Sequence, residues 1–317
     1  MSLLDVDRVV SVSVVICAYT HAWWNTPVTA VLSAQLQDPA TTEVILVIGH
    51  NESSLARVRL QTPWVKATVN TRRSGLSGTR NSEVAAATGN VVALLDAAAE
   101  EGWLAHVVEV YQAGSVLGLG GLVTPLRTTE RPRWSPSEFG CSFHEMPETT
   151  AAVRNVIGTN MSFRSDPLGA SRGFASELGR VEGEASGCEE TELCIRMTGQ
   201  EGGRLSYEPV ARVAYQVPPT WTTWGYFVRR CYQEGCSKVD VARVAGPNQA
   251  LQTEWSHLRG VIPRRVARCL TPTRRVPVGV TMGVAVLVAG GLDHSAVLAH
   301  GHLPSLKRRC ADVTTRR

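Results

Sequence analysis

The chain has 317 residues, of which 44% are hydrophobic and 19% charged, a composition that can form a sizeable core and excludes a disordered chain. Its 28 glycines and 16 prolines are too few and too scattered for a fibrous or low-complexity protein. The net charge of +4 is unevenly distributed, because residues 243–317 hold 12 lysines and arginines against three acidic residues. A basic C-terminal segment therefore follows a mildly acidic body.

Predicted strands and helices alternate through the first 112 residues. Apolar runs rich in β-branched residues predict buried strands over residues 9–18, 43–48, 65–70 and 91–95. Helical spacing of apolar residues, or alanine enrichment, predicts helices over 27–37, 81–88 and 103–112. This alternation predicts an α/β fold in which helices cover a mostly parallel central sheet. In such sheets ligands bind at the carboxyl ends of the strands, where Thr20 and Asp96 lie.

The second half of the chain is less regular. Residues 128–147 are proline-rich and predict a long loop or a small ribbon, and residues 190–197 predict a short amphipathic helix. Residues 205–217 predict a strand pair or a strand followed by a loop. Residues 221–244 predict a long helix with an aromatic side and a basic side.

The C-terminal segment differs from the body in both charge and pattern. Residues 276–292 form an uncharged stretch of 17 residues, which is shorter than the roughly 20 that a membrane span needs. We expect a helix that packs on the body or on a partner protein, or that lies at a membrane surface through its basic flanks. The predicted organisation is a domain at residues 9–245 and a basic, mainly helical extension at 246–317.

The sequence argues against several common kinds of site. Eight cysteines are present without a Cys-x-x-Cys pair, so a zinc ribbon or a thioredoxin-type site is not expected. Residues 75–78 and 118–121 are glycine-rich but lack the other residues of a phosphate loop or a dinucleotide fingerprint. The N-terminus lacks the pattern of a secretory signal, which predicts a cytoplasmic protein with free thiols. No nucleic-acid-binding module accompanies the basic segment, so no nucleic-acid partner is expected.

Six local patterns follow one another along the chain. They are the strand that ends at Tyr19-Thr20, GLSGTRN (75–81), VVALLD (91–96), GTNMSFR (158–164), GCEETELCIR (187–196) and YEP (207–209). In this order and spacing they resemble a bacterial, inverting family 2 glycosyltransferase with a GT-A fold, and the resemblance covers residues 9–244. The resemblance implies an enzyme that moves a sugar from a nucleotide-sugar donor to an acceptor hydroxyl.

The resemblance assigns a catalytic role to Glu190. An inverting transfer needs one carboxylate base that takes the proton of the attacking hydroxyl, and Glu190 corresponds to the second residue of the family's acidic pair. Glu189 would contact the acceptor or order the loop, and Asn160 would line the sugar or acceptor pocket. The residues alone leave a second interpretation open, in which the acidic residues only stabilise a helix N-terminus and Asn160 only shapes a turn.

The resemblance also implies donor-binding residues at the ends of strands and helices. Arg80 and Asn81 follow Gly75 at a predicted helix start, where backbone N–H groups and a guanidinium suit a pyrophosphate. The alternative is a surface arginine beside a turn. Asp96 corresponds to the first acidic residue of the family's DxD motif, and Thr20 follows the first strand.

The sequence departs from the family pattern at three places. The DxD motif reads Asp96-Ala97-Ala98, and Tyr215 stands where the family often has a histidine after YEP. Residues 48–51 lack the acidic residue that would read the nucleobase. Because a hard divalent cation needs several oxygen ligands, we expect no metal cofactor, although the resemblance by itself would imply Mn²⁺ or Mg²⁺.

Two functions remain open at this point. In the first, a metal-independent glycosyltransferase meets the charge of the leaving group with Arg80, with Arg72 and Arg73, or with basic residues of the helix predicted over 221–244. In the second, a non-catalytic relative binds an acceptor or a partner glycosyltransferase. The acceptor of an active enzyme could be a saccharide, a lipid-linked intermediate or a small natural product.

Overall fold

A computed structural model describes residues 9–18, 25–49, 52–114, 116–132, 134–135, 146–179 and 187–246. Thr20 and the extension beyond Gly246, with its apolar stretch at 276–292, lie outside the described residues. The chain divides into two compact units, Met1–Pro132 with Pro136–Trp221 and Arg133–Ser135 with Thr222–Arg317.

Four parallel strands form the first half of the sheet. They are β1 (Val12–Ala18), β2 (Glu43–Ile48), β3 (Lys66–Val69) and β4 (Val91–Leu95). β1 lies between β2 and β4, and β3 pairs with the other side of β2. The connecting helices are α1 (Asn25–Gln35), α2 (Glu52–Gln61) and α3 (Leu76–Ala86). Strands that are buried on both faces read as mostly apolar runs, which is why the sequence predicted β1, β2 and β4; the edge strand β3 is partly exposed.

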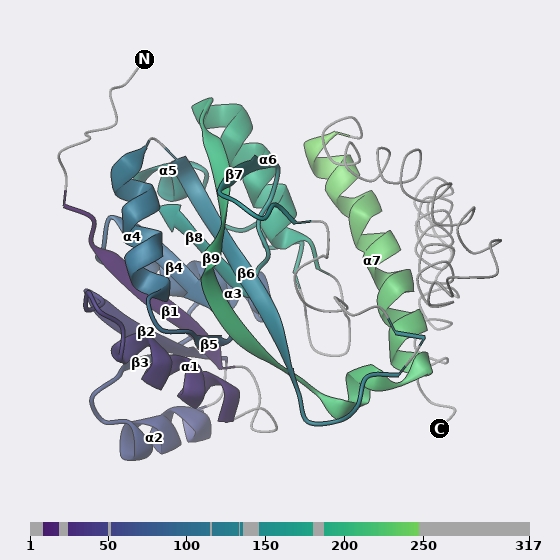
Figure 1. Cartoon of the computed structure of the whole chain (residues 1–317), viewed down its shortest axis with the longest axis horizontal. Helices are drawn as coiled ribbons and strands as arrows, with labels where there is room; N and C mark the ends of the chain where they lie inside the picture. The colour runs from purple at the N-terminus through teal and green to yellow at the C-terminus, as the bar shows by residue number, and fades with distance from the viewer. Residues whose placement is uncertain are drawn as a thin grey trace. The chain divides into compact units, whose positions relative to one another are not determined.

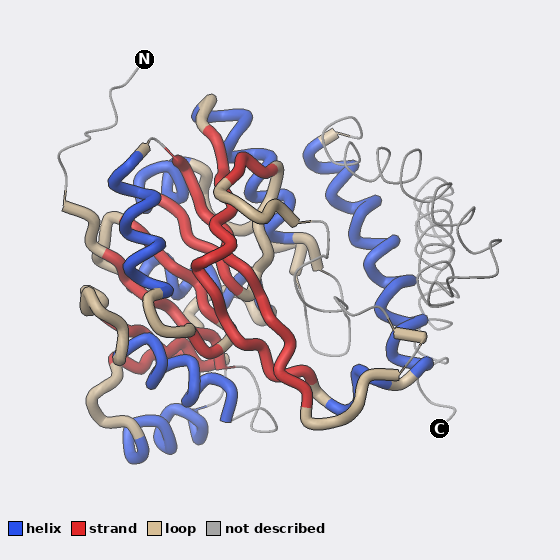
Figure 2. Tube along the Cα trace, viewed as in Figure 1, coloured by secondary structure: helices blue, strands red, loops and turns tan. Residues whose placement is uncertain are grey.

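The second half of the sheet contains antiparallel pairs. β8 (Asn160–Arg164) is antiparallel to β4 and to β6 (Val116–Arg127). β9 (Arg204–Val217) is parallel to β6, and the short strands β5 (Ala98–Ala99) and β7 (Ala151–Val153) are antiparallel to β9. The strand order is β3-β2-β1-β4-β8-β6-β9-β5, with β7 beside β9, and Figures 1 and 2 show the sheet between helices. The predicted α/β fold is confirmed, with antiparallel pairs added to the expected parallel strands.

One predicted element differs from the structure, and another agrees with it. Residues 205–217 belong to one strand, β9, and not to a strand pair; its register with β6 shifts between Gly121 and Leu122. The described part of 128–147 contains no helix and no strand, as expected for a loop.

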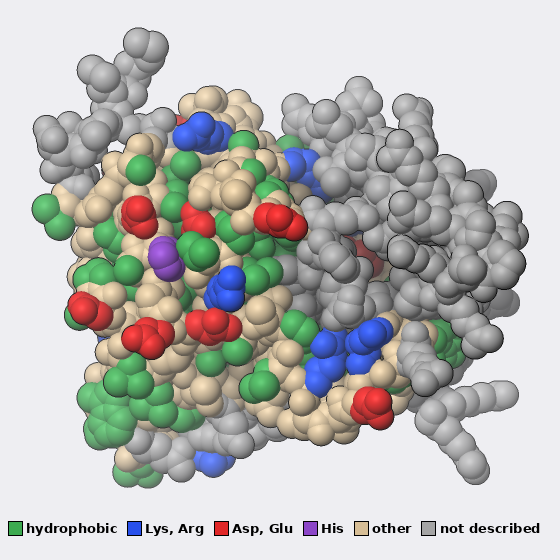
Figure 3. Space-filling view, viewed as in Figure 1, with side chains coloured by type: hydrophobic (Ala, Val, Ile, Leu, Met, Phe, Trp, Pro, Cys, Tyr) green, Lys and Arg blue, Asp and Glu red, His purple; other side chains and the backbone are tan. Residues whose placement is uncertain are grey.

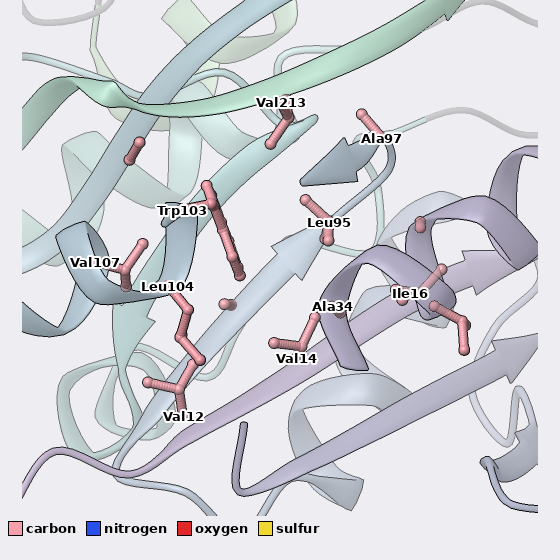
Figure 4. Close-up of a cluster of buried hydrophobic side chains, with 14 of the residues drawn as sticks. Val12, Val14, Ile16, Ala34, Leu95, Ala97, Trp103, Leu104, Val107 and Val213 are labelled. Atoms are coloured by element: carbon pink, nitrogen blue, oxygen red, sulfur yellow. The ribbon is translucent and has the colours of Figure 1, made fainter. Parts of the chain in front are cut away.

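Hydrophobic side chains fill both faces of the sheet. One face buries Val14 and Ile16 of β1 under α1, α2 and α4 (Trp103–Ala113), and Figure 4 shows Trp103 reaching into this cluster. The other face buries Val15 under α3, α5 (Ser165–Ala170) and α6 (Glu189–Glu201). Successive residues of a strand point to opposite faces, so β1 contributes to both cores and fixes the position of its carboxyl end.

The second unit contains the helix α7 (Trp224–Ala245), which follows the 3-10 turn η2 (Pro219–Thr222). Trp134 packs edge-on against Trp224 and Phe227 within this unit. The helix was predicted over 221–244 as part of the first domain, whereas the structure groups α7 with the second unit. The predicted domain boundary at residue 245 stays a prediction. In the part of the chain that the structure describes, no helix is long and apolar enough to cross a membrane.

Figure 3 shows acidic side chains spread over the face in view and not gathered into one patch. A buried group of charged side chains lies at the carboxyl end of β4.

The N-terminal part of α3 is packed so tightly that a methyl group does not fit at Gly78. A Cβ there would collide with the backbone carbonyl oxygen of Arg73, so we expect Gly78→Ala to lower the free energy of unfolding by about 1–3 kcal/mol in urea titrations. Gly199 in α6 has open space around it. Gly199→Ala should therefore raise stability by roughly 0.5–1 kcal/mol through helix propensity alone. Equal effects of the two changes would contradict this account of α3.

Candidate active site

The candidate site gathers residues from four parts of the chain at the carboxyl end of β4. Asp96 follows the last residue of β4, and its N–H donates a hydrogen bond to the Thr159 carbonyl oxygen at 3.0 Å. Leu95 pairs with Asn160, the first residue of β8. Because β4 and β8 are antiparallel, the end of one strand meets the beginning of the other. Arg80 reaches the same place from α3.

Arg80 is the centre of the buried charge cluster. Its guanidinium donates to Glu189 Oε1 at 2.5 Å, to Asp96 Oδ2 at 3.2 Å and to the Gly158 carbonyl oxygen at 3.1 Å. The side chain is only 4% exposed. A charge in such a place is tolerated when it is paired and hydrogen-bonded. Burial lowers the pKa of Arg80, but the charges of Glu189 and Asp96 outweigh burial and raise it above the usual value, so Arg80 stays charged.

The absence of a side chain at Gly158 leaves space for the Arg80 guanidinium. A Cβ at Gly158 would lie 2.9 Å from Arg80 Nη2, closer than a side-chain carbon can approach. Glycine therefore lets the backbone carbonyl come within hydrogen-bonding distance of the guanidinium. On its other side, Arg80 lies 5.5 Å from the centre of the Phe174 ring, a distance that favours a cation–π contact.

Three glutamates in the first turn of α6 have different surroundings. Glu189 is 3% exposed and bound to Arg80, and Glu192 is bound to Arg196 at 2.7 Å. Glu190 is only half-buried. Burial lowers the pKa of Arg80, and the charge of Glu190 raises it, although less than the charges of Glu189 and Asp96 do. Carboxylates in a first helical turn are favoured by the helix dipole, so the dipole explains their presence but not their differences. Glu190 is the one of the three that is not enclosed.

The side chains of Asn81 and Asn160, two further predicted site residues, form hydrogen bonds with other parts of the protein. Asn81 accepts a hydrogen bond from the Phe174 N–H and donates one to the Phe174 carbonyl oxygen, both at 2.8 Å. Asn160 is buried, accepts from Trp103 Nε1 at 2.9 Å and donates to the Ala211 carbonyl oxygen at 2.9 Å. For Asn160 these contacts favour the structural interpretation over a sugar pocket. Gly75 precedes α3 with a φ of 120°, which glycine adopts without strain.

Comparison with known proteins decides the family. The model of the Glycosyl transferase family 2 matches residues 13–171. The chain is 30% identical over 237 residues to a glucosyl-dolichyl phosphate glucuronosyltransferase from Haloferax volcanii, over 72% of this chain and 76% of the relative. The chain belongs to glycosyltransferase family 2. The predicted family is confirmed, and the protein is a glycosyltransferase.

Solved structures confirm the GT-A fold of this family 2 glycosyltransferase. A mannosyltransferase from Pyrobaculum calidifontis in complex with GDP-Man and Mn²⁺ matches with a TM-score of 0.55 and 18% identity, over 92% of this chain and 88% of that chain. GalNAc-T7 with UDP, GalNAc and Mn²⁺ matches with a TM-score of 0.51 and 15% identity, over 85% of this chain and 60% of that chain. At these identities the likeness shows the fold alone.

Ala98 and Tyr215, at which the sequence predicts a departure from the family's metal-binding pattern, lie on the paired strands β5 and β9. β5 pairs with β9 so that Ala98 lies opposite Ala214 and Ala99 opposite Val213. Tyr215 therefore follows the residue that faces Ala98, and its ring lies 5.7 Å from that of Trp221. Among the described residues, no group of three histidine, cysteine, aspartate or glutamate side chains is placed to hold a metal ion.

One buried acid of the site was not singled out from the sequence. Glu83 lies on α3, three residues after Arg80, and is 1% exposed. Burial and the charge of Asp96 raise the pKa of Glu83 to about 8. The sequence could have indicated Glu83 through its position one helical turn beyond Arg80, since residues three apart share a helix face. None of the six patterns that carry the family resemblance includes Glu83.

Proposed function

We propose that this glycosyltransferase moves a sugar from a nucleotide-sugar donor to an acceptor hydroxyl with inversion, without a divalent cation, and with Glu190 as the base. The observation that carries the proposal is the difference in burial between the glutamates of α6. Glu189 and Glu192 are 2% and 1% exposed, whereas Glu190 is half-buried beside the Arg80 cluster. A base has to be close to the donor site and open to an incoming acceptor.

In the proposed reaction the acceptor oxygen attacks the anomeric carbon from the face opposite the diphosphate. The new C–O bond forms as the bond to the diphosphate oxygen breaks, the hydroxyl proton passes to Glu190, and the nucleoside diphosphate leaves. Asp96 lies at the carboxyl end of β4, where the donor binds in sheets of this kind. Arg80 acts as a positioning residue, because it fixes Asp96 and Glu189 relative to each other.

The proposal replaces the earlier expectation that Arg80 contacts the pyrophosphate directly. Its guanidinium already donates to two carboxylates and a carbonyl oxygen. Positive charge at the carboxyl edge is instead available from Arg72 and Arg73, which are exposed in the turn after β3. Asn70 holds this turn, since it accepts from the Arg72 N–H at 2.8 Å and donates to the Arg73 carbonyl oxygen at 3.2 Å.

Metal independence is proposed because the side chains present do not fit a hard divalent cation. Asp96 is the single carboxylate left of the DxD motif and already accepts from Arg80. Ala98 has no ligand atom, and Tyr215 offers a phenol in place of an imidazole. Glu100 is directed elsewhere, since the Thr124 hydroxyl donates to its carboxylate at 3.4 Å. Manganese and magnesium need several oxygen ligands from the protein and the donor.

We expect transfer activity to be unchanged in excess chelator and not to rise when manganese is added. Ala98→Asp with Tyr215→His restores the carboxylate and the imidazole of the family pattern and should create manganese affinity that calorimetry detects. The matched control, Ala98→Asn with Tyr215→Phe, changes the same positions without adding a carboxylate or an imidazole and should bind none. Loss of wild-type activity in chelator and its return with manganese would contradict metal independence and make Glu100 the first residue to test.

We propose a lipid-linked intermediate as the acceptor class. The support is the Haloferax volcanii relative, whose name describes a glucosyl-dolichyl phosphate glucuronosyltransferase. Such an acceptor would bring the enzyme to a membrane surface, which is one of the two roles that the sequence left open for the extension at 246–317, the other being packing on the body or on a partner. The test is a matrix of nucleotide sugars against lipid-linked, saccharide and small-molecule acceptors, with products identified by mass spectrometry. Absence of any product or donor-dependent thermal shift would favour the non-catalytic alternative, which the family match does not support.

A further inference from the structure

Glu83 is the acidic residue of the cluster that the proposed reaction does not use. It lies on α3 one turn beyond Arg80, with 1% of its surface exposed. Its Oε1 has no hydrogen-bond partner among the described residues. The groups that face it are the Cys17 thiol of β1, which is hydrogen-bonded to its carboxyl, the Asp96 carboxylate and the Arg80 guanidinium.

The charges of this cluster leave no cation for an ionised Glu83. Arg80 carries one positive charge and is shared by the carboxylates of Asp96 and Glu189. An ionised Glu83 would add a buried negative charge and would compete for the same guanidinium from the same helix face. A neutral carboxyl group avoids both costs, because burying an acid is far less unfavourable than burying its anion.

We propose that Glu83 is a positioning residue that acts as a neutral acid: it keeps Arg80 committed to Asp96 and Glu189 and keeps a further negative charge away from the donor diphosphate. This inference rests on the proposed function, because it assumes that the donor binds at the carboxyl end of β4. It gives the enzyme a proton-dependent donor site. The donor binds well while Glu83 holds its proton and binds poorly once the proton is lost.

The pH range of the effect follows from the groups that face Glu83. Burial, followed by the charge of Asp96, raises the pKa of Glu83 to about 8. Desolvation, followed by the charge of Glu83, raises the pKa of the Cys17 thiol well above its usual value. The pKa of Arg80 is also raised, since burial is outweighed by Glu189 and Asp96. Between pH 7 and 9, Glu83 is therefore the facing group that changes charge.

The experiment measures the affinity of UDP and of GDP by calorimetry between pH 7 and 9, for the wild type and for Glu83→Gln. One pH unit above its pKa, about a tenth of Glu83 is protonated, so wild-type affinity should fall about tenfold from pH 7 to 9. Glu83→Gln is neutral at every pH and should keep the affinity that the wild type has at pH 7. Titration of the nucleotide itself affects both proteins equally and cancels in the comparison.

Urea unfolding of the same two proteins reports on Glu83 without any ligand. The native state holds a proton on Glu83 that the unfolded chain loses above its ordinary pKa, so wild-type stability falls as pH rises from about 5 to 8 and levels off above. Glu83→Gln lacks this decline. Glu83→Met, which is uncharged and similar in size, should also lose the pH dependence of nucleotide affinity and serves if the glutamine variant folds poorly.

The outcomes separate this inference from the proposed function. A wild-type nucleotide affinity that does not change with pH, or the same decline in Glu83→Gln, overturns the role of Glu83 while leaving the donor site intact. If neither UDP nor GDP binds the wild type at any pH, the donor site and the role of Glu83 both fall. The urea titrations then still decide whether Glu83 is neutral in the native protein.

Discussion

Replacing Glu190 with glutamine is expected to lower kcat by a factor of about 10² to 10⁴, the usual contribution of a general base. Glutamine keeps the size of the side chain and removes its ability to take a proton. Donor affinity should be nearly unchanged, because the Arg80 ion pairs involve Asp96 and Glu189. The measurement is steady-state transfer to a saturating acceptor, combined with calorimetry of the nucleotide.

A matched control lies on the same helix. Glu201 is exposed at the last residue of α6, and Glu201→Gln makes the same chemical change far along the helix from the cluster. It should leave kcat and donor affinity as they are. Near wild-type transfer by Glu190→Gln would exclude Glu190 as the base and would turn attention to Glu189. A parallel loss of donor affinity would instead indicate a binding role.

Replacing Arg80 with methionine is expected to lower the free energy of unfolding by about 3–5 kcal/mol, because it leaves buried carboxylates without their cation. Glu189 is the more affected partner, since it is 3% exposed while Asp96 is 30% exposed and keeps some contact with water. Urea denaturation at neutral pH measures the change.

Two further variants test the origin of that loss. Arg59 is exposed on α2, so Arg59→Met should alter stability by no more than about 0.5 kcal/mol. The double variant Arg80→Met with Glu189→Met removes both charges of the buried pair and should recover a large part of the loss, as a double-mutant cycle would show. A loss below about 1 kcal/mol for Arg80→Met would mean that the pair has little net effect on stability.

The parallel half of the fold could be predicted because most residues of β1, β2 and β4 are apolar. β2 and β4 have the predicted bounds, and β1 begins at Val12 instead of Val9. β6 was missed because it contains glycines and Pro125, which usually signal a turn. In the structure these glycines leave space for neighbouring side chains. At Gly118, for example, a Cβ would lie only 2.5 Å from the Phe163 ring. That requirement comes from another strand and cannot be read from the local sequence.

Most residues of the candidate site could be predicted, but Glu83 and the contacts within the site could not. The order of the motifs was sufficient to name Arg80, Asp96 and Glu189, and the structure brings all three together. It was not sufficient to show that Arg80 binds carboxylates, because a guanidinium suits a carboxylate and a phosphate equally well. Asn160 was assigned to a pocket through the family resemblance, whereas its hydrogen bonds to Trp103 and Ala211 depend on tertiary packing.

The ion pair between Arg80 and Glu189 joins residues 109 positions apart in the chain, and this has a consequence for how the protein is made. During synthesis α3 and β4 emerge well before α6, so a nascent chain holds Arg80 and Asp96 but neither Glu189 nor Glu190. Contacts of such long range form late in folding. The proposed base Glu190 and β4 therefore come together only when most of the domain has been synthesised, and a chain that still lacks α6 is not expected to transfer the donor sugar.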